Sequence, residues 1–127
     1  VQLPSGKVQG VRAAYVDAYL GMPFAAAPVG SLRWAPPRKL EQWSGVFAAT
    51  QYGASCPQAA DYFLHSRRSC RGYTRGACKG YSEDCLNLNV YSPRTEGLKP
   101  VMVWIFGGCF VSGSAQNYDG SAFASAQ

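Results

Sequence analysis

Apolar residues near the start of the chain occur in short runs that glycine and charged residues interrupt. Residues 8–11 and 13–20 have the apolar content of β-strands, and Gly10 and Arg12 separate them. Gly6 supplies a turn before the first run. The pattern predicts a small antiparallel sheet in the N-terminal part of the chain.

Prolines are frequent between residues 21 and 37. Because proline lacks the backbone N–H and fixes φ, neither a helix interior nor a central strand fits this segment. We expect extended coil that lies over a core. Four aromatic side chains supply the apolar surface to anchor it: Phe24, Trp34, Trp43 and Phe47.

A half-buried strand is predicted after residue 85. Leu86, Leu88 and Val90 alternate with asparagine and tyrosine, which predicts one apolar and one polar face.

Residues 101–106 are apolar at every position. This pattern is typical of a strand covered on both faces, as parallel strands in α/β proteins are. Later in the chain, Asp119 or Ser121 is expected to start a helix.

Composition limits the fold to one domain or a piece of one. The chain has 127 residues, of which 47% are hydrophobic and 15% charged, so it is globular, but two domains would leave each half short of core. The longest apolar run, residues 101–111, contains two glycines and is shorter than the about 20 apolar residues that a membrane span needs. No membrane span is therefore predicted.

The formal net charge of +5 comes from one stretch, which we interpret as part of a long surface loop over residues 56–84. Removing its five cations leaves a neutral chain; they are Arg67, Arg68, Arg71, Arg75 and Lys79. A solvated loop is the simplest interpretation, and substrate steering or an anionic surface is the alternative. No nucleic-acid-binding motif accompanies the cations, so no nucleic-acid partner is expected.

Five cysteines in a short chain favour disulfides and an oxidising compartment, so we expect a secreted, extracellular protein. A zinc site is the rival interpretation. Its ligands would be His65, Cys70, Cys78 and Cys85, but no C-x-x-C spacing supports it.

The apolar run of residues 101–106 leads directly into Gly107 and Gly108. Glycines at the end of a buried strand let backbone N–H groups converge on a ligand, because no Cβ obstructs them. Each such donor can stabilise a developing oxyanion by about 3 to 4 kcal/mol. A plain tight turn is the alternative interpretation.

Residues 82–93, with the sequence SEDCLNLNVYSP, closely resemble the signature segment of the type-B carboxylesterase and lipase family, the cholinesterase-like branch of the α/β-hydrolases. The resemblance covers almost the whole chain. The segment IFGG at 105–108 is most similar to that of fungal esterases and lipases. The other matching segments are YLGMPFA at 19–25, PVGSLRW at 28–34, WSGV at 43–46, SCPQ at 55–58 and PVMVWI at 100–105.

The resemblance implies an α/β protein in which residues 1–127 form the N-terminal portion of a single, incomplete α/β-hydrolase domain. That portion would hold the small antiparallel sheet, a long disulfide-closed loop and the first strands of the central sheet. It also implies a serine ester hydrolase without cofactor or metal. Gly108 and Cys109 match the positions whose N–H groups form the oxyanion hole, and Gly107 shapes that loop.

Two further residue pairs follow from the resemblance. Cys56 and Cys85 match the disulfide that closes the long loop, and Arg33 and Glu83 match a buried structural ion pair. Cys70 and Cys78 could then pair with each other and leave Cys109 free, although the sequence permits other pairings.

Two positions depart from the family pattern. Cys109 stands where the family has its third glycine, and Phe106 stands where a histidine often precedes the glycines. A side chain at position 109 restricts φ, with a strain of about 1 to 2 kcal/mol if φ is positive there. The thiol is also expected to narrow the acyl pocket.

The chain contains no G-x-S-x-G, the motif that carries the nucleophilic serine. His65, the one histidine, lies in the irregular loop and is interpreted as a surface residue. We therefore expect part of a longer hydrolase that acts with the remainder of its own domain and is inactive alone. A basic loop without tryptophan disfavours choline-type cations, so neutral or acidic esters, including lipid and aromatic acid esters, are the expected substrates.

Two alternatives remain from the sequence. A non-catalytic adhesion or binding protein can be built on the same fold, since fold does not determine function. An independent disulfide-stapled β-module is the other, but residues 101–106 would then lack layers to cover both faces.

Overall fold

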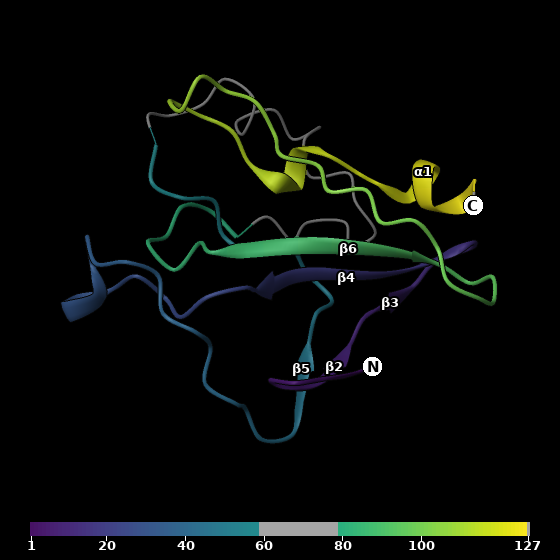
Figure 1. The fold of residues 1–127 in the computed structure, drawn as a ribbon. Coiled ribbons are helices and arrows are strands. Elements are labelled where there is room, and N and C mark those ends of the chain that lie inside the picture. Colours follow the sequence, from purple (N-terminus) through teal and green to yellow (C-terminus); the bar gives the residue numbers. More distant parts are fainter. Residues whose placement is uncertain (59–78, 127) are drawn as a thin grey trace.

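The computed structural model describes residues 1–58 and 79–126 of the chain. Two small sheets form its centre, and Figure 1 shows β4 and β6 side by side, with β2 and β5 to one side of them and α1 to the other. In chain order the elements are β1 Gln2–Leu3, β2 Gly6–Gln9, β3 Val11–Arg12, β4 Val16–Pro23, the 3₁₀ turn η1 Gly30–Leu32, β5 Val46–Ala48, β6 Asn87–Pro93, the 3₁₀ turn η2 Ala115–Asn117 and α1 Ser121–Ser125.

The larger sheet has the order β3-β4-β6, with both pairs antiparallel. Alternate residues of β4 point into the core, where Val16, Ala18 and Leu20 are each at most 2% exposed. The strand that the apolar content of residues 13–20 predicts is thus present, and the burial of every second residue follows because side chains alternate between the faces of a strand. The core also includes Tyr52, with Tyr91 packed against it.

The pairing of β4 with β6 is interrupted by a bulge between Tyr19 and Met22. Gly21 lies in the bulge with φ of 64°, and its N–H donates to Asn89 Oδ1 at 2.9 Å. The side chain of Asn89 thus replaces the ladder bond that the bulge removes. Next to the bulge, the Leu20 N–H donates to the Ala49 carbonyl, which ties β4 to the segment that follows β5.

The smaller sheet has the order β1-β2-β5 and is mixed. Strand β1 pairs with β2 in antiparallel fashion, but β2 pairs with β5 in parallel. The predicted antiparallel sheet of the N-terminal part is confirmed by the β3–β4 pair, and the parallel β2–β5 pair is an addition that the sequence did not predict. A parallel pair needs a long crossover, and residues 10–45 supply it through β4 and the proline-rich segment.

Strand β6 has the predicted apolar and polar faces, but its apolar face points away from the described core. Leu88 and Val90 are 37% and 40% exposed, whereas the alternate residues face the described core. The Asn87 Nδ2 donates to the Ala54 carbonyl at 3.0 Å, and the Asn89 Nδ2 donates to the Ala115 carbonyl at 3.3 Å. Hydrogen bonds from the asparagines thus decide which face turns inward.

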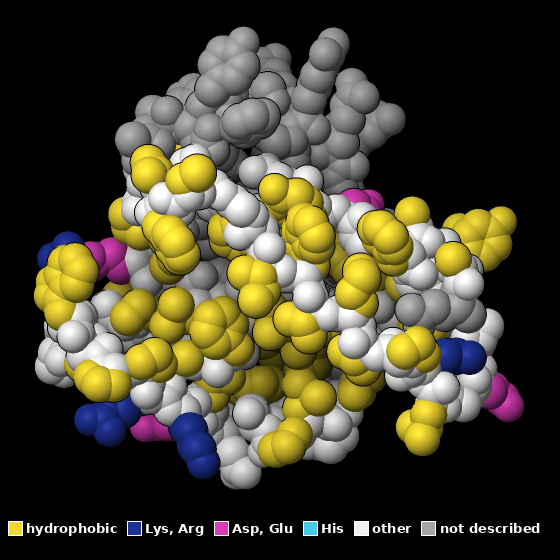
Figure 2. All heavy atoms as spheres, turned by 45° about the horizontal axis from the view of Figure 1, so that its top comes forward, with side chains coloured by type: hydrophobic (Ala, Val, Ile, Leu, Met, Phe, Trp, Pro, Cys, Tyr) yellow, Lys and Arg dark blue, Asp and Glu magenta, His cyan; other side chains and the backbone are white. Residues whose placement is uncertain are grey.

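Residues 101–106 are not a strand in this structure, contrary to the expectation, and are 40% to 88% exposed. Within the described ranges, no strand pairs with them. A strand needs at least one neighbour to pair with, and a fully buried strand also needs layers on both faces; the described residues provide neither. Figure 2 shows apolar side chains spread over the face to which this segment belongs.

The aromatic anchors also differ from the expectation. Trp34 is 92% exposed and Phe24 is 54% exposed, so neither anchors the proline-rich segment. Trp43 and Phe47 instead pack on each other, with ring centroids 5.6 Å apart, and Trp43 Nε1 donates to the Lys7 carbonyl at 2.9 Å. These contacts attach the segment around β5 to β2, and they do not involve residues 21–37.

Helix α1 begins at Ser121, one of the two starts that the sequence predicts. Asp119 Oδ1 accepts a hydrogen bond from the Ser121 N–H at 2.9 Å. The helix packs against β6 and β4. In the part of the chain that the structure describes, no helix has the length and apolar character to cross a membrane.

Candidate functional site

The residues that follow the apolar segment form a tight loop over residues 107–113. The Gly108 carbonyl accepts hydrogen bonds from the Val111 N–H at 2.9 Å and from the Ser112 N–H at 3.1 Å. These two hydrogen bonds turn the chain back on itself. A Cβ at Gly108 would overlap the Ser112 carbonyl oxygen, and φ there is 140°. Only glycine fits this position.

Cys109 and Phe110 continue the loop in the left-handed region, with φ of 54° and 59°. Cys109 is exposed and its thiol is free, while Phe110 is fully exposed. Within residues 1–58 and 79–126, neither the Gly108 nor the Cys109 amide donates a hydrogen bond. Adjacent backbone N–H groups without an acceptor among these residues have the chemistry to bind an anionic oxygen.

The far end of the loop is held by side chains from the segment around Cys56. Gln58 bonds both backbone groups of Gly113: its Oε1 accepts from the N–H at 2.8 Å, and its Nε2 donates to the carbonyl at 3.0 Å. At the residue after Gly113, the Ser114 Oγ accepts a hydrogen bond from Ser55 Oγ at 2.8 Å. Sequence pattern alone gave no role to Gln58 or Ser55, although both lie in the SCPQ segment.

The structure joins Cys56 and Cys85 in a disulfide, which places the SCPQ segment beside the start of β6. The proposed zinc ligands His65, Cys70 and Cys78 and the cations Arg67, Arg68, Arg71 and Arg75 lie outside the described residues. Cys85 is bonded to Cys56 in the disulfide, so it has no thiolate with which to bind zinc. No cluster of potential metal ligands occurs among the residues that the structure describes.

Arg33 and Glu83 form the expected ion pair, with Arg33 Nε 2.7 Å from Glu83 Oε1. The pair is not buried, which corrects the expectation, because the two side chains are 55% and 39% exposed. The guanidinium of Arg33 also lies 5.3 Å from the ring centroid of Trp34. An exposed pair of this kind contributes about 0 to 1 kcal/mol to stability.

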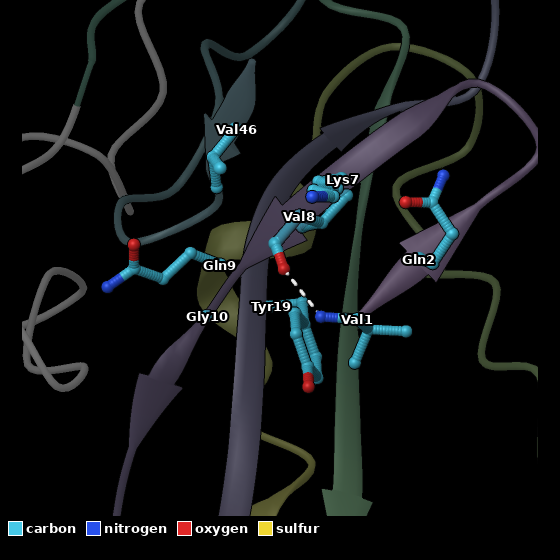
Figure 3. A pocket seen from close by; sticks show the side chains of 8 residues that line it. All are labelled: Val1, Gln2, Lys7, Val8, Gln9, Gly10, Tyr19 and Val46. Atoms are coloured by element: carbon cyan, nitrogen blue, oxygen red, sulfur yellow. Dashed lines mark hydrogen bonds between the residues drawn. The ribbon is translucent and has the colours of Figure 1, made fainter.

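A separate hollow lies between β1, β2, β4 and β5, away from the loop (Figure 3). Val1, Val8, Tyr19 and Val46 are among its lining residues, and the Val1 amino group donates to the Val8 carbonyl at 2.8 Å. Burial, and secondarily the charge of Asp17, raise the pKa of Tyr19 above its ordinary value of 10.0, so its phenol stays neutral at physiological pH. The lining includes no Ser, Cys, His, Asp or Glu, so it offers no nucleophile or carboxylate.

Comparison with known proteins gives the chain a family. The sequence model described as "Carboxylesterase family" matches residues 1–127. The chain belongs to this family.

Carboxylesterase relatives come from bacteria and mammals. The fumonisin B1 esterase of Sphingopyxis macrogoltabida is 43% identical over 124 residues, which are 94% of this chain and 21% of the relative. The para-nitrobenzyl esterase of Bacillus subtilis is 43% identical over 122 residues, which are 94% of this chain and 23% of the relative. Carboxylesterase 5A of Homo sapiens is 41% identical over 112 residues, which are 86% of this chain and 19% of the relative. None of these three relatives is fungal, so the expected similarity to fungal members stays a prediction.

The fold agrees with the family. A solved PNB esterase superimposes with a TM-score of 0.82 and 40% identity, over 98% of this chain and 24% of the esterase. A thermophilic PNB esterase gives a TM-score of 0.78 at 39% identity, over 92% of this chain and 23% of the esterase. The carboxylesterase chain is therefore a portion of an α/β-hydrolase fold and spans about a quarter of the solved chains that it matches.

Proposed function

We propose that residues 1–127 are the N-terminal portion of a serine carboxylic-ester hydrolase and supply its oxyanion hole. Gly108 and Cys109 donate their N–H groups to the tetrahedral oxyanion, and Gly107 and Gly108 shape the loop. The supporting observation is that these two amides have no acceptor among the described residues of a carboxylesterase-family chain. Each donor would be worth about 3 to 4 kcal/mol in the transition state.

The remainder of the domain supplies the other catalytic groups in this proposal. A serine attacks the ester carbonyl, and a histidine oriented by a carboxylate takes the serine proton. The same remainder covers the exposed segment 101–106 and the outward face of β6, where apolar side chains otherwise meet water. The protein is secreted, and it acts on neutral or acidic esters, including lipid and aromatic acid esters.

Ester hydrolysis by the full-length protein that contains this chain tests the proposal. We expect turnover of para-nitrophenyl butyrate and para-nitrobenzyl acetate, and loss of that turnover after treatment with an organophosphate that labels serine. Residues 1–127 alone are expected to show no turnover above buffer. Absence of both turnover and serine labelling in the full-length protein would instead support a non-catalytic binding protein on the same fold.

Cys109 is expected to restrict the acyl group that the site accepts. In the full-length enzyme, Cys109→Gly removes the thiol beside the proposed oxyanion donors and suits the positive φ of 54°. We expect kcat/KM for a branched ester such as para-nitrophenyl pivalate to rise about tenfold relative to the acetate, since pocket size discriminates on this scale. An unchanged ratio between the two substrates would contradict this role.

A further inference from the structure

The side chain of Gln58 forms two hydrogen bonds with Gly113, the last residue of the loop over residues 107–113. Its Oε1 accepts from the Gly113 N–H at 2.8 Å and its Nε2 donates to the Gly113 carbonyl at 3.0 Å. The second Nε2 hydrogen is directed to the Cys56 carbonyl at 3.1 Å. The carboxamide is thus engaged on both its oxygen and its nitrogen, so its orientation is fixed.

Gly113 is the point at which the loop returns to its own beginning. A Cβ at Gly113 would lie 2.8 Å from the Gly107 carbonyl oxygen and 2.9 Å from the ring of Phe106. The last residue of the loop is therefore in contact with the first. Because the intervening residues include Gly108 and Cys109, a side chain that holds Gly113 also limits where their N–H groups can point.

The segment that carries Gln58 is itself rigidly attached. Cys56, two residues earlier, is bonded to Cys85. Ser55 is 4% exposed and its Oγ bonds Ser114 Oγ at 2.8 Å and accepts from Gln116 Nε2 at 2.5 Å. Two points of the SCPQ segment thus contact the end of the loop and the residues just after it, which makes the connection resistant to rotation.

We propose that Gln58 is the positioning residue of the oxyanion loop. It touches neither substrate nor reacting atoms, and it acts by holding Gly113 so that the Gly108 and Cys109 amides converge on one place. The inference rests on the proposed function, because it assigns these amides to the oxyanion. A displacement of the two N–H donors weakens binding of the transition state and not of the uncharged ester. Loss of this positioning is therefore expected to lower kcat and to leave KM unchanged.

Gln58→Met in the full-length enzyme tests the inference, since methionine keeps the length of the side chain and removes its hydrogen bonds. For para-nitrophenyl butyrate we expect kcat to fall about 10- to 100-fold with KM within about twofold of the parent. The affinity for a trifluoromethyl ketone, which places an oxyanion in the site, is expected to fall by the same factor. Hydrogen exchange of the Gly108 and Cys109 amides is expected to accelerate.

Gln42→Met is the matched control, because Gln42 Nε2 also donates to a backbone carbonyl, that of Pro4, far from the loop in sequence. It is expected to keep parental kcat and parental exchange of residues 107–113. An unchanged kcat in Gln58→Met, or a lower kcat without loss of ketone affinity, would overturn the inference.

The exchange measurement separates this inference from the proposed function. If the parent protein hydrolyses no ester, the proposed function fails. Accelerated exchange of the Gly108 and Cys109 amides in Gln58→Met would still support the positioning of the loop, and unchanged exchange would overturn it.

Discussion

Gly108→Ala in the full-length protein is expected to lower kcat/KM for para-nitrophenyl butyrate by about 100-fold or more. The new Cβ would overlap the Ser112 carbonyl oxygen, which is backbone and cannot rotate away. The loop must therefore open, and the adjacent N–H groups move with it. A shift of about 1 Å in catalytic groups costs about 100-fold in rate.

Gly45→Ala is the matched control for the backbone angle alone. Gly45 also has a positive φ, 76°, but nothing lies within 4 Å of the position that its Cβ would take. This variant is expected to retain parental kcat/KM and to lose about 1 kcal/mol of stability. Parental kcat/KM in Gly108→Ala would show that the loop does not depend on close approach of its backbone.

Removal of the Cys56–Cys85 disulfide is expected to destabilise the full-length protein by about 3 to 4 kcal/mol. The two cysteines are 29 residues apart in sequence, and the cross-link restricts the unfolded chain over that interval. The measurement is urea unfolding of the double variant Cys56→Ser/Cys85→Ser under oxidising conditions. Cys109→Ser serves as the stability control, because Cys109 forms no disulfide and is expected to change the free energy of unfolding by less than about 0.5 kcal/mol.

Loss of the disulfide is also expected to loosen the SCPQ segment and, through Gln58, the glycine loop. A double variant that unfolds at the same urea concentration as the parent would contradict the stabilising role of the cross-link. A double variant that is less stable but keeps the parental kcat would contradict only its connection to the loop.

Much of the local structure could be predicted from the sequence. The apolar content of residues 13–20 predicted a strand, and β4 forms there with Val16, Ala18 and Leu20 on one buried face, since a strand has a side-chain period of two. The glycine pair after residue 106 predicted a turn there, and the structure shows a tight loop over residues 107–113. The resemblance to the type-B carboxylesterases paired Cys56 with Cys85.

Tertiary contacts decided which face of β6 meets the described core, which the local pattern did not reveal. The side chains of Leu88 and Val90 are apolar but face outward, because Asn89 supplies the bulge at Gly21 with a hydrogen bond and Asn87 bonds the Ala54 carbonyl. A buried backbone N–H without an acceptor costs about 1 to 3 kcal/mol, and no local pattern reveals where such a group lies.

The amino-acid sequence by itself determined the features that depend only on their own stretch of backbone: the apolar run of residues 101–106, the glycines after it and a helix that begins at Asp119 or Ser121. Only the tertiary structure decided that residues 101–106 stay unpaired within the described residues and that Gln58 holds Gly113, 55 residues later. The physical reason is that sheet pairing and side-chain clamps join segments distant in the chain. Their geometry therefore depends on which neighbours are present and not on the pattern of any one segment.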